Sequence, residues 1–268
     1  MTKLEHIFFK LLKIILPDKT KYYLCLYFRN EAFEFGYNDP LQIGTSLPFC
    51  SDQVLLDKIS CDLALRKQHQ SVTAIDVGAH VGEWTKEFLN RNAGANIIMI
   101  EPQKSKMAIL GEFAEKHENI CYLQCLVGAE DKTEETFYDA ENSSSVLKPG
   151  KSLVEHGGMK VKSVTKVKMR TIDSICEQQK ISKVDVIKID VQGFEMAVLE
   201  GAKKSLENVI YVNMEVNLGE GLYECSSKFD KVVKFMYEQG FSFYDIGDLF
   251  RYPDSGELSQ IDCWFRKQ

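Results

Sequence analysis

The sequence has little positive charge relative to its negative charge. Its 33 lysines and arginines are outnumbered by 39 aspartates and glutamates, so the formal net charge is −6 at pH 7. Proteins that bind nucleic acid rely on phosphate contacts from clustered basic side chains, and an acidic chain is a poor general binder of this kind. A local basic patch would escape this count, but the composition argues against a nucleic-acid partner.

Paired cysteines are also absent. None of the eight cysteines is part of a Cys-x-x-Cys pair, and most lie within apolar runs, where cysteine behaves as a small hydrophobic residue. The start of the chain does not have the basic, apolar and small-residue pattern of a secretory signal peptide. We therefore expect reduced thiols, a cytoplasmic location and no zinc site.

The sequence also has few long apolar runs. A membrane-spanning helix needs about 20 predominantly apolar residues. The stretch from Leu4 to Leu16 has apolar residues at the spacing of one helix face, carries Lys10 and Lys13, and ends at Pro17. Such a helix either rests on the inner face of an anionic membrane, as a peripheral contact, or packs on the domain or on a second copy of the chain as a homo-oligomer. We favour packing, because amphipathic helices in soluble proteins usually face a core.

What the sequence does have is an alternation of strand-like and helix-like segments. Residues 1–70 are expected to form an N-terminal extension (a helix, an aromatic-rich segment over 20–50, and a helix over 51–68) with a lid, oligomer or membrane-contact role. Residues 71–268 indicate one α/β domain with a mostly parallel sheet. Its strands are expected near 72–77, 96–101, 120–127, 184–190 and 207–216, with an insertion at about 129–170 that holds short strands at 135–139 and 160–169, and a final antiparallel pair at 241–246 and 261–265.

The segment from Ala74 to Thr85 predicts a buried strand, a glycine turn and the start of a helix. Gly78 and Gly82 allow the backbone to turn sharply and to approach a ligand, which a Cβ atom would obstruct. Glu101 lies 19 residues beyond Gly82, where a βαβ unit places an acid that can bind both hydroxyls of a ribose. The spacing is Gly-x-x-x-Gly and not Gly-x-Gly-x-x-Gly, which favours a nucleoside without a pyrophosphate. S-adenosylmethionine (SAM) is the leading candidate.

A second segment makes the prediction more specific. It has the sequence Asp-Val-Ile-Lys-Ile-Asp-Val-Gln-Gly-Phe-Glu from Asp185 to Glu195, with Thr-Ile-Asp upstream at 171–173 and Val-Leu-Glu-Gly-Ala downstream at 198–202. Together with the Asp-Val-Gly-Ala-His-Val-Gly turn at 76–82, these motifs resemble those of the FkbM-type SAM-dependent methyltransferases. The resemblance covers residues 72–216, just over half of the chain.

The resemblance implies a class I SAM-methyltransferase fold, which is a Rossmann-like, mostly parallel sheet with an antiparallel C-terminal hairpin. It also implies that Asp76 and the backbone at 78–82 line the methionine part of SAM, that Glu101 holds its ribose, and that Pro102 shapes the turn beside the adenine. Gln192 stands where the family commonly has glutamate, which bears on any role of this position. The cofactor-binding candidates are Asp76, Gly78, Ala79, His80, Gly82, Thr85, Glu101, Pro102, Leu126, Ser144 and Asp190.

Three of these candidates have alternative readings. Asp76 could instead cap the loop that follows its strand. His80 is expected to shape the loop or to form a hydrogen bond with the ligand. Ser144 lies in a run of three serines, and such a run is more often a simple turn than a binding site.

Methyl transfer to oxygen needs an aligned hydroxyl and a group that takes its proton. Asp190 and Glu215 lie at the ends of two neighbouring predicted strands, so these carboxylates are the preferred pair for acceptor binding and proton abstraction. They could alternatively bind a divalent cation that acidifies the hydroxyl, since hard cations favour carboxylate oxygens. We favour the version without a metal, because only two strong oxygen ligands are evident.

Two further residues are catalytic candidates. Lys188 interrupts a buried strand, and a buried lysine must be paired or have a depressed pKa. We expect a structural ion pair with an acid such as Glu195, with catalysis as the alternative, because a lysine–aspartate–glutamate arrangement also occurs in ribose 2′-hydroxyl methyltransferases. His156 could enter the acceptor site from the insertion as a base, although a lone loop histidine is more often a surface residue.

These inferences together predict a SAM-dependent O-methyltransferase that acts on a hydroxyl of a sugar, a glycan or a sugar-bearing natural product. The sugar is implied by the resemblance alone. One alternative is a non-catalytic subunit of the same fold that binds a glycan or a partner protein, against which the intact glycine turn and Glu101 argue. A nicotinamide oxidoreductase is disfavoured by the glycine spacing and the antiparallel ending, and an RNA methyltransferase by the acidic charge.

Overall fold

The structure, a computed structural model, describes residues 52–67, 70–140, 143–150, 154, 159–218, 222–252 and 256–268. The helix predicted from Leu4 to Leu16, the aromatic segment over 20–50 and the candidate base His156 lie outside the described residues. The second helix of the predicted extension, expected over 51–68, is α4 at Asp52–Lys67.

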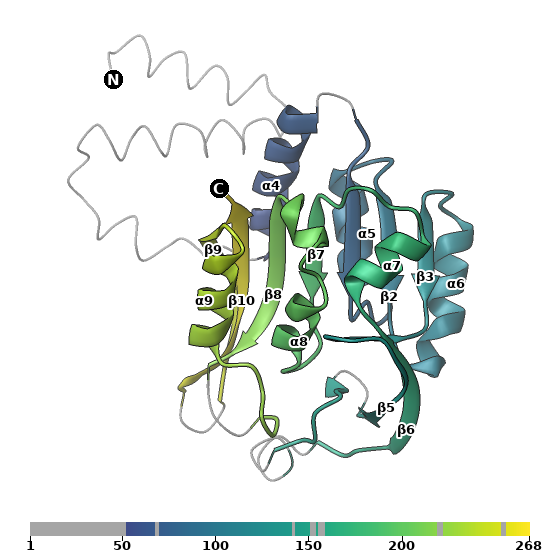
Figure 1. The fold of residues 1–268 in the computed structure, drawn as a ribbon, viewed down its shortest axis with the longest axis vertical. Helices are drawn as coiled ribbons and strands as arrows, with labels where there is room; N and C mark the ends of the chain where they lie inside the picture. Colours follow the sequence, from purple (N-terminus) through teal and green to yellow (C-terminus); the bar gives the residue numbers. More distant parts are fainter. Residues whose placement is uncertain are drawn as a thin grey trace, which may run out of the picture. The chain divides into compact units, whose positions relative to one another are not determined.

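A seven-stranded sheet forms the centre of the described chain (Figure 1), with the order β3-β2-β1-β7-β8-β10-β9. The first five strands in this order are parallel, and β10 pairs antiparallel with both β8 and β9. This arrangement confirms the predicted fold class, including its antiparallel ending. The strands are β1 (Thr73–Val77), β2 (Asn96–Ile100), β3 (Ile120–Leu123), β7 (Val186–Ile189), β8 (Tyr211–Asn217), β9 (Phe241–Arg251) and β10 (Leu258–Lys267).

Helices cover both faces of the sheet because the central strands are apolar on both sides. Along β2, Ile97 and Met99 pack with α4, α5 and α6, whereas Ile98 and Ile100 pack with α7, α8 and α9. These helices are α5 (Glu83–Arg91), α6 (Met107–Glu115), α7 (Ile172–Gln178), α8 (Glu195–Glu200) and α9 (Phe229–Glu238), with short 3-10 turns at Lys104–Lys106 and Ser205–Glu207. Among the described helices, none is both long and apolar enough to cross a membrane.

The strand predicted over 120–127 is wrong as a single element. The chain leaves the main sheet after β3, and the next strand, β4 (Leu126–Val127), pairs instead with β6 (Ser163–Arg170) in a second sheet of order β4-β6-β5. The third strand of this sheet is β5 (Lys132–Asp139). Mostly apolar residues continue through the change of sheet, although β3 is largely exposed and β4 is buried, so hydrophobic pattern alone could not reveal it.

Two glycines fix the end of β4 against α8. A Cβ atom on Gly201, at the end of α8, would lie 2.1 Å from the carbonyl oxygen of Gly128, which follows β4. No side chain fits in that space, so the backbones are in direct contact. This contact brings the second sheet next to the strand that carries Asp190.

We therefore expect Gly201→Ala to lower the free energy of unfolding by roughly 2–3 kcal/mol, because the added methyl group must push two backbones apart. Thermal unfolding should show a fall in Tm of about 5–10 °C for a domain of this size. Gly111→Ala within α6 is the matched control, since its Cβ would meet only the hydroxyl of the half-exposed Tyr122, at 3.2 Å. That variant should be neutral or stabilising, and equal losses in both variants would contradict the argument.

Candidate active site

A pocket opens at the carboxyl ends of β1, β2 and β7. Ligands of open α/β sheets bind at such an edge, where the strand order reverses, and here the reversal lies between β1 and β7. The pocket is concave and open to solvent, as small-molecule sites at this edge of an α/β sheet are. Of the predicted cofactor residues, those that line it are Gly78, His80, Glu101, Pro102, Leu126, Ser144 and Asp190.

The glycine turn after β1 is held against both neighbouring strands. The backbone N–H groups of Gly78 and Ala79 donate to the carbonyl oxygen of Ile100, at 2.9 and 3.0 Å. Gly78 has a φ of +78°, and a Cβ atom there would lie 1.8 Å from the carbonyl oxygen of Asp190. Glycine is therefore required here by contact with the end of β7 as well as by its conformation.

Glu101 is a buried carboxylate fixed in the wall of the pocket. Its Oε2 accepts a hydrogen bond from the backbone N–H of His80 at 2.8 Å, and its Oε1 accepts one from that of Gln103 at 2.9 Å. Burial raises the pKa of Glu101, while these two backbone donors act in the opposite direction. Each oxygen can still accept a second hydrogen bond, so the carboxylate can receive two hydroxyl donors from a ligand.

Ser144 forms the predicted turn, and its hydroxyl also reaches the loop that carries Glu101. Its hydroxyl accepts from the backbone N–H of Ala140 at 2.8 Å, which is a turn contact, and from the side-chain amide of Gln103 at 2.9 Å. The second bond ties the insertion to the loop that carries Glu101. Apolar pocket walls on this side come from Leu126, Val127, Phe137, Val146 and Phe194.

Four predicted cofactor residues lie behind the pocket surface rather than among its lining residues: Asp76, Ala79, Gly82 and Thr85. The fully buried Asp76 accepts a hydrogen bond through Oδ2 from the Thr85 hydroxyl at 2.7 Å. Gly82, with a φ of +82°, is the residue that precedes α5. The carboxylate of Asp76 therefore ties β1 to the helix that follows, through the Thr85 side chain.

Lys188 lies with its ammonium group between two carboxylates. Its Nζ is 3.5 Å from Asp76 Oδ1 and 3.4 Å from Asp190 Oδ2, and it donates to the carbonyl oxygen of Gly78 at 3.1 Å. Burial disfavours the charged amine, but Asp190 and Asp76 outweigh it and raise the pKa of Lys188. The predicted ion pair exists, but Glu195 was the wrong partner, since its carboxylate turns to the backbone N–H of Gly193 at 2.8 Å.

Asp190 and Glu215 are joined by one side-chain amide. Gln192 Nε2 donates to Asp190 Oδ1 and to Glu215 Oε1, each at 2.8 Å. Glu215 Oε1 also accepts from Gln260 Nε2 at 2.7 Å. Burial, followed by the nearby charges of Asp190 and Asp262, raises the pKa of Glu215 well above its ordinary value. A cation that bridged the two bound oxygens would have to displace the amide nitrogen.

The chain matches the family model described as "Methyltransferase FkbM domain" over residues 76–243, more than half of its length. It belongs to the FkbM methyltransferase family. It is also 24% identical over 160 residues to the 2-O-methyltransferase NoeI of Sinorhizobium fredii (strain NBRC 101917 / NGR234), a match that covers 56% of this chain and 65% of that relative.

Several solved structures of methyltransferases are similar to this member of the FkbM family. Magnesium protoporphyrin IX methyltransferase (ChlM) from Synechocystis PCC 6803, with bound SAM, matches with a TM-score of 0.41 and 12% identity, over 94% of this chain and 98% of that one. The 1,6-didemethyltoxoflavin-N1-methyltransferase of Burkholderia thailandensis, with bound S-adenosylhomocysteine, matches with a TM-score of 0.42 and 14% identity, over 94% and 92%.

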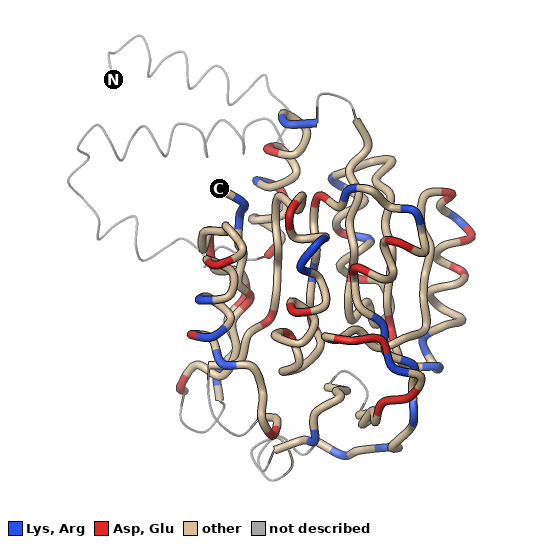
Figure 2. Tube along the Cα trace, viewed as in Figure 1, with Lys and Arg blue, Asp and Glu red and all other residues tan. Residues whose placement is uncertain are grey.

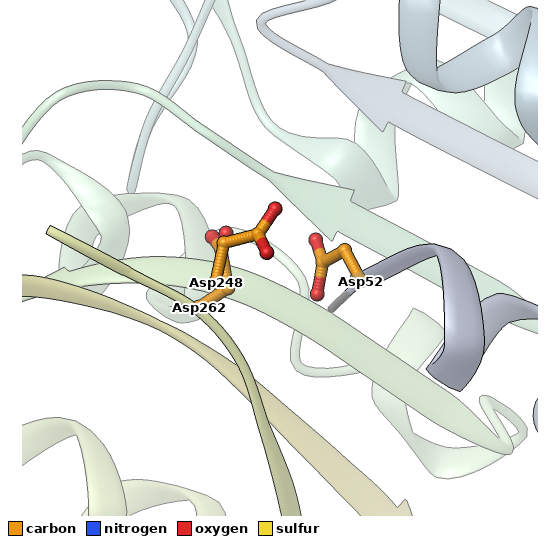
Figure 3. Close-up of side chains that lie close together, drawn as sticks. All are labelled: Asp52, Asp248 and Asp262. Carbon is orange, nitrogen blue, oxygen red and sulfur yellow. The ribbon is translucent and has the colours of Figure 1, made fainter. Parts of the chain in front are cut away.

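A further group of carboxylates continues from Glu215 in this FkbM-family chain. Asp262 is the partner of Glu215 in the register of β8 and β10, and the carboxylate oxygens of Asp52, Asp248 and Asp262 lie within 4.8 Å of one another (Figure 3). Burial raises the pKa of Asp262 to about 8 and that of Asp52 to about 6. Asp52 Oδ1 accepts from Trp264 Nε1 at 2.9 Å, which fixes the start of α4 on β10.

The sequence reasoning did not assign any role to Gln192, Tyr223 or Asp262. Tyr223 is buried, and its hydroxyl donates toward Gln192 Oε1 at 3.0 Å and toward the carbonyl oxygen of Ser143 at 2.9 Å. A signal for Asp262 was present, because it alternates with Gln260 and Trp264 on one face of a strand that is otherwise buried. Tyr223 had no such signal, since it comes from a loop whose position depends on the tertiary structure.

Glu195 gives a prediction about pH. The side chain is 1% exposed, Oε2 has no hydrogen-bond partner in the described part of the chain, and burial raises the pKa of Glu195 from 4.5 to about 8. Because the folded state binds this proton more tightly than the unfolded state, the group contributes full stability below about pH 4.5 and loses it as the pH rises through 8.

Glu195→Gln removes this dependence while keeping an oxygen that can accept from Gly193. We expect the free energy of unfolding of the variant, relative to the original chain, to increase by roughly 3 kcal/mol between pH 5 and pH 8. Urea unfolding at the two pH values measures it. The exposed Glu200→Gln in the same helix is the control, and a difference that does not change with pH would contradict the prediction.

Proposed function

We propose that this FkbM-family chain is a SAM-dependent O-methyltransferase whose acceptor is a hydroxyl of a sugar or of a glycosylated natural product. The observation that supports it most is the placement of a fixed acid, Glu101, and a second acid, Asp190, on opposite sides of one pocket at the strand-order reversal. The first suits the hydroxyls of a ribose and the second suits a reacting hydroxyl.

The residues present fit SAM. Glu101 retains acceptor capacity toward the pocket, and apolar residues of the second sheet and of the loop after β7 give an adenine ring a place to pack. The buried His80 Nε2 has no hydrogen-bond partner in the described part of the chain, so it is open to a ligand contact. When bound, SAM supplies a methyl group on a positively charged sulfonium, and transfer leaves the neutral thioether.

Asp190 and Glu215 are the groups that we assign to the acceptor. As the acceptor oxygen forms its bond to the methyl carbon and the carbon–sulfur bond breaks, the hydroxyl proton passes to one of these two carboxylates. Burial raises the pKa of Glu215, and a higher pKa makes a carboxylate a stronger base toward a hydroxyl proton. Lys188 is already paired with two acids, so we assign it to holding Asp190 in place rather than to proton transfer.

The charges around this site support an uncharged polyol acceptor. Beside Asp190 and Glu215 lie the carboxyl groups of Asp262 and Asp52, whose oxygens can accept hydrogen bonds from hydroxyl donors. Over the described chain, basic and acidic residues are interspersed (Figure 2). In the pairing of β5 and β6, for example, Glu135 lies opposite Val167, next to Lys166. The 2-O-methyltransferase name of the relative from Sinorhizobium also favours a hydroxyl acceptor.

The cofactor is tested by calorimetric titration of the purified full-length chain with S-adenosylhomocysteine, with NAD as the control. We expect micromolar binding of S-adenosylhomocysteine and none of NAD. If folded, ligand-free protein binds neither compound, the enzyme proposal fails and a non-catalytic subunit becomes the better reading. Binding of NAD alone would indicate an oxidoreductase instead.

The catalytic assignment is tested by Asp190→Asn, which keeps the shape of the side chain and removes its charge. We expect methyl transfer to neutral glycoside acceptors to fall roughly 100-fold, because general-base and orienting contributions are of this order, while the affinity for S-adenosylhomocysteine changes less than about threefold. Asp173→Asn, in α7 and outside the pocket lining, is the control for the substitution itself. Unchanged turnover in Asp190→Asn would remove Asp190 from the mechanism.

A further inference from the structure

We infer that Gln192 is the positioning residue of the acceptor site: its side-chain amide holds Asp190 and Glu215 in one fixed arrangement and links them to the insertion. The inference deepens the proposed function and rests on it for its catalytic consequence. This chain has an amide at position 192, and the inference is based on the contacts of that amide and not on the sequence motif.

Both side-chain amide hydrogens of Gln192 have an acceptor. Gln192 Nε2 lies 2.8 Å from an oxygen of Asp190 and 2.8 Å from an oxygen of Glu215, so each of its two N–H groups has one acceptor. A carboxylate in the place of this amide would present an oxygen to two other carboxylate oxygens at contact distance. The site as built therefore requires a donor with two hydrogens between the acids, and glutamine supplies it without adding a charge.

Two hydroxyl groups fix the position of Gln192 itself. Its oxygen accepts from the Tyr223 hydroxyl at 3.0 Å, which sets the side chain so that the nitrogen faces the acids. Its backbone carbonyl oxygen accepts from the buried Ser145 hydroxyl at 2.9 Å. Gln192 thus connects the insertion, through Ser145 and Tyr223, to both candidate bases.

Gln192 also has an unusual backbone conformation. Gln192 has a φ of +54°, in the left-handed region that costs a non-glycine residue about 1 kcal/mol or more. The next residue is Gly193, but the left-handed position before it is occupied by glutamine, which has a long polar side chain. Residues held in this way are concentrated at functional sites, which agrees with a side chain placed to reach Asp190 and Glu215.

Other titratable groups face the same pair from the surrounding elements. They are Lys188 on β7, Glu195 on α8, Tyr223 in the loop before α9, Asp262 on β10 and Asp52 on α4. Asp76 on β1 contacts Lys188, and Asp248 on β9 lies beside Asp262. Lys188 contacts Asp190, and within the described residues no ammonium or guanidinium group is paired with Glu215. Neutral amides from Gln192 and Gln260 are the donors to Glu215.

The test compares Gln192→Met, which keeps the length and removes the hydrogen bonds, with Gln192→Glu, which keeps the shape and replaces the donors by acceptors. Gln179→Met, at an exposed position in the loop after α7, is the matched control. We expect kcat for methyl transfer to fall about 10- to 100-fold in both Gln192 variants, as for a misplaced reacting group, with the affinity for S-adenosylhomocysteine within threefold of the original. A loss of affinity as large as the loss of kcat, or no loss of kcat, overturns the inference.

The pH profile separates positioning from a general packing defect. In Gln192→Glu the new carboxyl can act as a donor to its neighbours only when it is protonated, so its kcat relative to the original chain should be highest near pH 6 and fall as the pH rises. Gln192→Met has no such group, and its relative kcat should not show this fall. Parallel profiles for the two variants overturn the inference.

A readout without acceptor keeps this inference distinct from the proposed function. Gln192→Met should lower Tm more than Gln179→Met does, because Asp190 and Glu215 lose the donor that joins them. Equal Tm values for the two variants overturn the inference even if the chain methylates sugars. A loss of Tm confined to Gln192→Met in a chain that binds no SAM sustains the arrangement and rejects the function.

Discussion

The ammonium group of Lys188 is the constraint on which the rest of the site depends. It contacts Asp76 in β1, Asp190 at the end of β7 and the carbonyl oxygen of the glycine turn. An unpaired charge in this buried place would be costly, whereas a paired one requires that all its partners hold their positions. The glycine turn after β1 and the acid at the end of β7 are therefore located by one common group.

The acids around Lys188 differ in the cations and hydrogen-bond donors that contact them. Asp190 has the amine and an amide donor, and Asp76 has the amine and a hydroxyl. Glu215 and Asp262 lie farther along the same edge, and burial is the first cause of the raised pKa of each. Asp76 and Asp190 are therefore paired with an ammonium group, whereas among the described residues no such pair reaches Glu215 or Asp262.

Much of this arrangement could be predicted from residues close together in the sequence. Strand patterns located β1, β2, β7 and β8, and the glycine spacing with Glu101 located the pocket, because both depend on local backbone geometry and on the parallel order of strands. The partner of Lys188 was predicted wrongly as Glu195, because nearness along the chain suggested a contact that the turn of α8 directs elsewhere. Gln192, Tyr223 and Asp262 meet only through long-range packing, so no local pattern could bring them together.

The double backbone contact of Glu101 has a consequence for how defects in this protein will be observed. Its carboxylate is oriented by backbone N–H groups of this chain, from the loops after β1 and β2. The ordering entropy of this contact is therefore part of folding and not of ligand association. A change that loosens either loop should weaken the equilibrium affinity for the nucleoside and leave the rate of the bound complex nearly intact.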